Sequence, residues 1–128
     1  MHYKRITRVV IAVKDAAATA AFYSETYGLK TEVRAEQPGG GLKRVWVDVG
    51  NAFIELLEPL REDLPEARFI REKGEGLYML CMEVDDAKAA VKDLRERGAR
   101  IDEAPDGGDF KAYILPESTH GVLIGLSE

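Results

Sequence analysis

The sequence predicts an α+β protein in which two tandem βαβββ modules form a curved mixed sheet around a cavity. The first observation is that TRVVIAVKD (7–15) returns as YMLCMEVDD (78–86), each an apolar strand that ends in an aspartate before an alanine-rich helix. The second is that FIELLE (53–58) returns as LIGLSE (123–128) at nearly the same spacing. Two copies of one strand-helix-strand unit within a single chain indicate an internal duplication.

Length and composition limit the classes of function. The chain has 128 residues, 45% hydrophobic and 32% charged, which predicts a single domain over 1–128 with an ordinary core. A net charge of −5 argues against a nucleic-acid partner, which requires a basic surface. Cys81 is the only cysteine, so no internal disulfide is expected. The N-terminal apolar run is too short for a signal peptide or membrane span, so we expect a cytoplasmic protein without a membrane partner.

The first module is predicted over about residues 5–59. A strand at 6–13 precedes Asp15, a good N-cap for a helix from Ala16 to Tyr27, and Gly28 is a good stop. Three further strands are expected in LKTEVRAE (29–36), KRVWVDVG (43–50) and AFIELLEP (52–59). The last two are joined at Gly50-Asn51, which is typical of a hairpin.

A linker helix and the second module complete the chain. Residues 60–75 predict a short helix that Asp63 caps before Pro65. The second module, about 76–128, repeats the first with an Asp86-capped helix from Ala87 to Arg97. Its strands are expected at 77–84 and near 99–104, 110–115 and 121–127.

One face of the predicted sheet has the composition of a ligand site. Because side chains alternate along a strand, the residues that do not face the helices share the opposite face. They combine apolar and polar groups, as a cavity does. A subunit interface is the alternative, since tryptophan and arginine are enriched there too. The candidate ligand-binding residues are Arg44, Trp46, Asp48, Phe53, Met79, Cys81 and Tyr113. Trp46 and Tyr113 would either stack on a planar ligand or pack in the core.

Four segments carry a resemblance to a known family. They are RVVIAVKD (8–15), IELLEPL (54–60), GEGLYMLCMEVDD (74–86) and LPESTHGVLIGL (115–126). Together they resemble the vicinal oxygen chelate superfamily, which includes glyoxalase I, extradiol dioxygenases, antibiotic-resistance proteins and methylmalonyl-CoA epimerase. The epimerase branch is the most similar in look. The resemblance implies a small-molecule ligand and a homodimer.

The resemblance also implies four metal-ligand positions, one on each of the first, fourth, fifth and eighth strands. They correspond to Arg8, Glu55, Met79 and Gly125 here. Only Glu55 is a usual ligand, because arginine is a cation without a lone pair to give and glycine has no side chain. The sequence therefore predicts that the metal site is lost and that no cofactor is bound. The glutamate that serves as ligand and base in such epimerases is Gly125 here.

These residues lead to three functional hypotheses. The first is a metal-independent isomerase or lyase on a small carboxylate or acyl thioester, with Glu55 as base and Arg8 as cationic stabiliser. The second is a non-catalytic ligand-binding protein, as in the antibiotic-resistance members. The third is an enzyme like methylmalonyl-CoA epimerase. An ion pair between Arg8 and Glu55 is the structural alternative to a catalytic role. The loop PDGGDFK (105–111) is expected to influence ligand choice.

Overall fold

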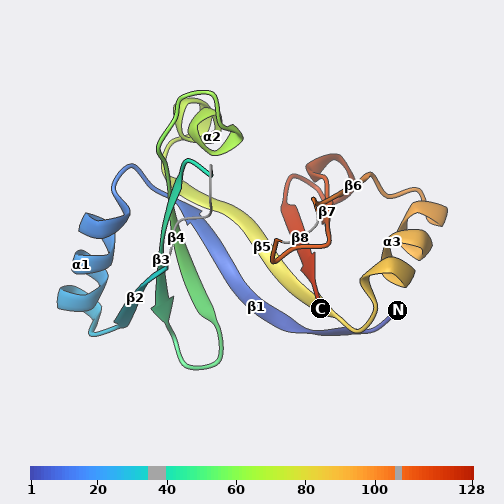
Figure 1. The fold of residues 1–128 in the computed structure, drawn as a ribbon, viewed down its shortest axis with the longest axis horizontal. Coiled ribbons are helices and arrows are strands. Elements are labelled where there is room, and N and C mark those ends of the chain that lie inside the picture. The colour runs from blue at the N-terminus through green and yellow to red at the C-terminus, as the bar shows by residue number, and fades with distance from the viewer. Residues whose placement is uncertain (35–39, 106–107) are drawn as a thin grey trace. The chain divides into compact units, whose positions relative to one another are not determined.

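The chain folds in the element order that the repeat predicts (Figure 1). The computed structural model describes residues 1–34, 40–105 and 108–128. The first half contains β1 (Tyr3–Ala12), α1 (Ala16–Tyr27), β2 (Lys30–Arg34), β3 (Leu42–Asp48), β4 (Phe53–Pro59) and α2 (Pro65–Lys73). The second contains β5 (Gly76–Val84), α3 (Ala87–Glu96), β6 (Ile101–Glu103), β7 (Ala112–Ile114), a 3₁₀ turn (Pro116–Ser118) and β8 (Leu123–Ser127). The α+β class is confirmed. The end of the predicted 29–36 strand lies outside the described residues.

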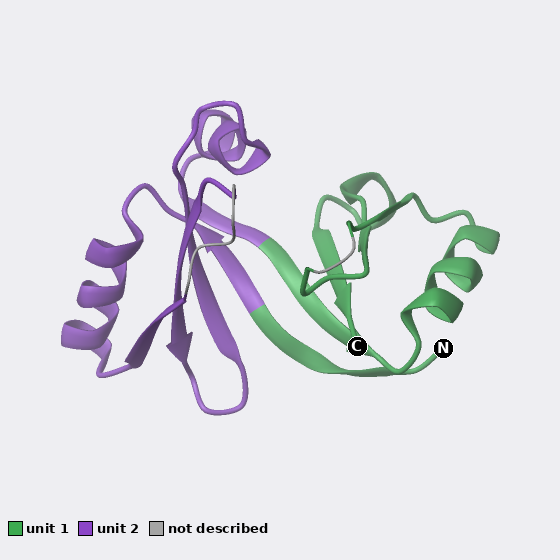
Figure 2. Ribbon diagram, viewed as in Figure 1, with its two compact units in different colours: residues 1–8, 79–128 green, residues 9–78 purple. Residues whose placement is uncertain are grey.

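The strands are hydrogen-bonded in the order β2-β3-β4-β1-β5-β8-β7-β6. β2, β3 and β4 are antiparallel neighbours, as are β6, β7 and β8, whereas β5 and β8 are parallel, so the sheet is mixed as predicted. The chain divides into two compact units, residues 9–78 and residues 1–8 with 79–128 (Figure 2). The division falls within β1 and β5, and each unit is described by itself below.

Equivalent acidic residues begin the helices of the two halves. The carboxylates of Asp15 and Asp86 each accept a backbone N–H of the first helical turn at 3.0 Å, as predicted for N-caps. Glu58 and Glu128, which the repeat pairs, each accept the N–H of the first helical residue, at 2.9 Å and 3.1 Å. The duplication seen in the sequence therefore includes the hydrogen bonds that join each helix to the last strand of its half.

Each unit has its own hydrophobic core. The core of unit 9–78 consists of Val13, Ala16, Ala20, Val45, Val47 and Leu56. The other core consists of Val84, Ala87, Ala90, Val91, Ile101, Ala112, Ile114 and Leu126. Val45 and Val47, on β3, both lie in the core of unit 9–78, because alternate side chains of a strand share one face. Val49 is 47% exposed, because β3 ends at Asp48.

The helix α2 is shorter than predicted and begins differently. Leu64 is its N-cap, without a side-chain hydrogen bond, and Pro65 occupies the first turn. The prediction that Asp63 caps the helix is wrong, because that carboxylate lies one residue too early and accepts from Arg61 Nε at 3.1 Å. Among the described helices, none is both long and apolar enough to cross a membrane.

Glu66, in the first turn of α2, makes stability depend on pH. It is 9% exposed, and desolvation raises the pKa of its carboxyl above 4.5. The folded state thus favours the protonated form, so this contribution to stability is complete below pH 4.5 and is lost as pH rises through the raised pKa. We expect Glu66→Gln, which cannot ionise, to gain stability over the wild type as pH rises, measured by urea midpoints across the acidic range.

The matched control for this prediction is Glu72→Gln, an exposed glutamate on the same helix. The gain in stability with pH is expected for the buried Glu66 and not for this exposed residue. Parallel pH profiles for the two variants would show that Glu66 has no such effect.

Candidate functional site

The predicted site residues fall into two groups, one in each compact unit. We define the Glu55 cluster, in unit 9–78, as Arg34, Arg44, Trp46, Phe53 and Glu55. We define the Arg8 cluster, in the other unit, as Arg8, Met79, Asp109, Phe110 and Gly125. Arg34 was not singled out from the sequence, and Asp109 and Phe110 were named only as part of the loop PDGGDFK (105–111).

Glu55 is a buried carboxylate engaged by two neighbours on β3. The antiparallel register places Trp46 opposite Glu55 and Arg44 diagonal to it. The indole Nε1–H of Trp46 donates to Glu55 Oε1 at 2.9 Å, and Arg44 Nη1 lies 3.6 Å from the same oxygen. The Glu55 side chain is only 4% exposed, so these contacts replace the water that a carboxylate otherwise requires. The observed ion pair of Glu55 with Arg44 was not predicted.

The indole of Trp46 contacts both a cation and a second ring. The guanidinium carbon of Arg34 lies 3.9 Å from the ring centroid, and the Phe53 ring is 5.0 Å away at 49°. A cation over an indole is attracted by the ring quadrupole. Packing thus accounts for this tryptophan, and stacking on a ligand stays a prediction. Arg34 could not be identified from the sequence, because its contact depends on the pairing of β2 with β3.

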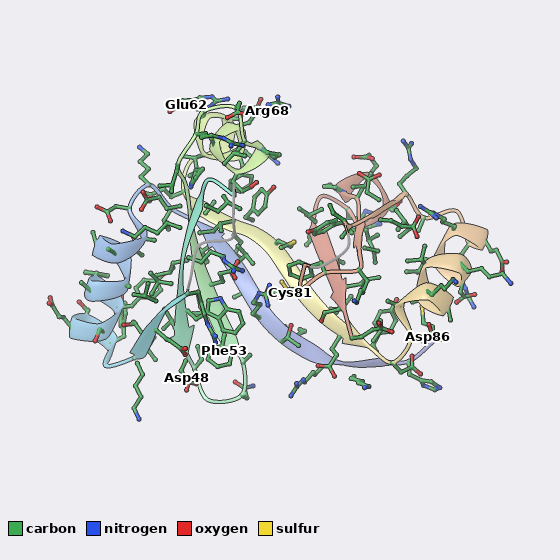
Figure 3. All side chains as sticks on the ribbon, viewed as in Figure 1. Asp48, Phe53, Glu62, Arg68, Cys81 and Asp86 are labelled. Carbon is green, nitrogen blue, oxygen red and sulfur yellow. The ribbon has the colours of Figure 1, made fainter. Side chains whose placement is uncertain are left out.

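Asp48 and Phe53 face each other at the end of the β3–β4 hairpin (Figure 3). Asp48 is exposed, and its Oδ1 accepts the N–H of Gly50 at 2.8 Å. Gly50 has φ 103°, a conformation that favours glycine. The carboxylate of Asp48 therefore stabilises the predicted turn, and its role in ligand binding stays a prediction.

Arg8, on β1, is a buried cation in the second group. The residue is 7% exposed. Its Nη2 lies 3.5 Å from Asp109 Oδ2, and its guanidinium carbon is 4.7 Å from the centroid of the Phe110 ring. Asp109 itself is 52% exposed at its side chain. Asp109, one partner of this buried cation, therefore remains largely in water.

Gly125, on β8, provides the space that the Phe110 ring occupies. A Cβ at this position would lie 2.7 Å from two carbons of that ring and 3.2 Å from Met79 Sδ. The Phe110 ring also packs at 5.5 Å against Tyr113 on β7. The absence of a side chain at residue 125 thus allows the ring to sit beneath the Arg8 guanidinium.

Cys81 lies on β5, opposite Gly125 in the parallel pairing, and is fully buried (Figure 3). Its backbone carbonyl accepts the Thr7 hydroxyl at 3.4 Å, which joins β5 to the first residues of β1. Burial makes the thiol a packing group rather than an accessible nucleophile.

The side chains of the Arg8 cluster do not fit a divalent metal. The guanidinium of Arg8 is itself positive and offers no lone pair, and the thioether of Met79 is a soft donor suited to copper(I). A donor at residue 125 would collide with Phe110. Across residues 1–34, 40–105 and 108–128, no group of three or more His, Cys, Asp or Glu side chains is arranged to hold a metal ion.

Comparison with known proteins finds consistent similarities. Residues 7–113 match the family described as the Glyoxalase/Bleomycin resistance protein/Dioxygenase superfamily. The mitochondrial methylmalonyl-CoA epimerase of Homo sapiens is 36% identical over 129 residues, covering 97% of this chain and 73% of the relative. The ethylmalonyl-CoA/methylmalonyl-CoA epimerase of Cereibacter sphaeroides is 34% identical over 130 residues, covering 97% of each chain.

Solved structures of epimerases are similar as well. Methylmalonyl-CoA epimerase from Mycobacterium tuberculosis has a TM-score of 0.85 at 29% identity, covering 96% of this chain and 86% of the other. A variant of the Streptomyces coelicolor enzyme in complex with 2-nitronate-propionyl-CoA has a TM-score of 0.84 at 29% identity, covering 98% and 94%.

Proposed function

Because the chain belongs to the glyoxalase/bleomycin resistance protein/dioxygenase superfamily, we propose that it binds an acyl thioester of coenzyme A and isomerises it by proton transfer at the α-carbon. The observation that carries this proposal is similarity to methylmalonyl-CoA epimerases over 97% of the chain at up to 36% identity. A bound acyl-CoA compound in a related structure supports the class of ligand.

The Glu55 cluster offers the groups that this reaction needs. In the proposed step the α-proton moves to the Glu55 carboxylate, and the electrons of the broken C–H bond move onto the thioester oxygen as an enolate. Arg44 Nη1, 3.6 Å from that carboxylate, supplies positive charge for the enolate. Addition of a proton from water to the opposite face of the planar enolate inverts the α-carbon and restores the thioester, and Glu55 then releases its proton to water, so the step needs no further reactant. Because the residues at Arg8, Met79 and Gly125 do not fit a divalent ion, no step is assigned to a metal.

A second candidate is a protein that binds the thioester without turnover. The observation in its favour is that Glu55 Oε1 is already engaged by Trp46 Nε1–H and by Arg44. A carboxylate held in this way can have a structural role, with ligand binding carried by other residues.

Deuterium exchange separates the two candidates. With methylmalonyl-CoA in D₂O, we expect the protein to accelerate loss of the α-proton signal in proton NMR, at the same rate with or without EDTA. Glu55→Gln keeps an acceptor for Trp46 but removes the base, and should lower the exchange rate about 100-fold. Glu62→Gln, at a side chain 91% exposed, is the matched control and should leave the rate unchanged.

The outcomes are distinct. Binding in calorimetry without α-proton exchange would favour the second candidate, and no binding of methylmalonyl-CoA or propionyl-CoA would contradict both. Exchange that requires an added divalent ion would contradict the conclusion that the Arg8 cluster does not fit a divalent metal.

A further inference from the structure

We propose that the Arg8 cluster is a carboxylate-binding site in which Asp109 occupies the place of the ligand carboxylate and is displaced by it. The inference rests on the proposed function only for the identity of the ligand, a thioester whose acyl group bears a free carboxylate. Arg8 would then select carboxylated acyl groups.

The Arg8 guanidinium is a buried cation. A buried guanidinium requires a compensating anion, because removing its hydration is costly. The Arg8 side chain is 9% exposed, and the Phe110 ring covers it at 4.7 Å. A guanidinium carries N–H donors along the edges of its plane, and two of them can bind one carboxylate through a pair of hydrogen bonds.

The ion pair between Arg8 and Asp109 is longer than a direct hydrogen bond between such groups. Arg8 Nη2 and Asp109 Oδ2 are 3.5 Å apart. Charge-assisted hydrogen bonds between guanidinium and carboxylate groups are shorter, about 2.7–2.9 Å. A ligand carboxylate not tied to a backbone can approach Arg8 more closely than Asp109 does.

The anions paired with Arg8 and Arg44 differ in their exposure to water. Asp109 is 52% exposed, so its carboxylate returns to water at little cost when a ligand replaces it. Glu55, the partner of Arg44, is 4% exposed and also holds Trp46 Nε1–H, so its displacement would leave buried polar groups without that partner. Exchange of the anion is therefore expected at Arg8 and not at Arg44.

Adjacent residues supply the anion and the ring. Asp109 carries the carboxylate, and Phe110 carries the ring that fills the space above Gly125. The carboxylate can therefore leave while the ring stays packed and keeps the guanidinium in place. Asp109 is therefore a partner that a ligand can replace. Removal of its charge should raise the affinity of the Arg8 cluster for a carboxylate ligand.

The test compares Asp109→Asn with the wild type by isothermal titration calorimetry. The probes are methylmalonyl-CoA, propionyl-CoA, which lacks the free carboxylate, and free malonate. Without the competing Asp109 charge, methylmalonyl-CoA and malonate should bind about fivefold more tightly, while propionyl-CoA should be unaffected. The matched control is Glu103→Gln, which removes an exposed charge paired with Arg95 and should change no affinity.

A second variant tests the geometry of Arg8. Arg8→Lys keeps the positive charge but loses the planar fork, so the preference for methylmalonyl-CoA over propionyl-CoA should fall about tenfold. Circular dichroism checks that both variants are folded. Because Asp109 is exposed, the Asp109→Asn comparison remains decisive if Arg8→Lys does not fold.

The outcomes separate this inference from the proposed function. If Asp109→Asn leaves malonate and methylmalonyl-CoA affinities unchanged or weaker, or if neither probe binds, the inference is overturned. If malonate binds more tightly to Asp109→Asn but no thioester binds, the carboxylate site stands and the proposed function fails. An equal gain in Glu103→Gln would indicate a general effect of charge and would also overturn the inference.

Discussion

Replacing Glu55 with leucine is expected to lower the free energy of unfolding by about 3 kcal/mol, because removal of one partner of a buried ion pair strands the other. The Glu55 carboxylate is 4% exposed and is shared by Arg44 and by the Trp46 indole. Urea denaturation followed by far-UV circular dichroism measures the change. Fluorescence of Trp46, the only tryptophan, reports on the same cluster.

A double variant shows whether the loss comes from the charge left behind. Arg44→Met combined with Glu55→Leu replaces both ions with apolar side chains of similar size and should recover more than half of the loss. Trp46→Phe removes only the N–H donor and should cost about 1 kcal/mol. A change for Glu55→Leu within about 0.5 kcal/mol of the wild type would contradict the assignment of a stabilising role to this carboxylate.

Gly125→Ala is expected to destabilise the protein by about 1–3 kcal/mol, as overpacking of a filled core does. The added Cβ would lie 2.7 Å from two carbons of the Phe110 ring, so the ring or the strand must shift. Gly76→Ala is the matched control, because Gly76 also lies in a strand and has no atom within 4 Å of the added Cβ. Thermal and urea denaturation of the two variants provide the comparison.

A smaller partner should relieve the collision at residue 125. Phe110→Leu removes the ring atoms that the added Cβ would meet. The double variant with Gly125→Ala should therefore lose less free energy of unfolding than the two single variants lose in sum. Simple addition of the losses, or equal destabilisation by Gly76→Ala, would show that contact with Phe110 is not the cause.

The sequence by itself determined the order of the elements and the helix starts. Asp15 and Asp86 cap their helices as predicted, and Gly28 ends α1 with φ 70°. These features depend on local chemistry, in which a short acidic side chain satisfies a free N–H and a glycine adopts a left-handed conformation at low cost. The strand faces at Val45 and Val47 follow from alternation alone.

The sequence also identified Arg8 and Glu55 as unusual polar residues within apolar strands, and both are buried. It did not identify Asp109 as a partner of Arg8 or Arg44 as a partner of Glu55. Only the tertiary structure decided that Glu55 meets Arg44 and that Arg8 meets Asp109, because these contacts depend on strand register and on the path of a loop. Periodicity indicates which face of a strand a side chain occupies. Arg44 reaches Glu55 across one hairpin, where strand register decides the contact. Arg8 and Asp109 are far apart in the sequence, so only the packing of distant segments brings these two charges together.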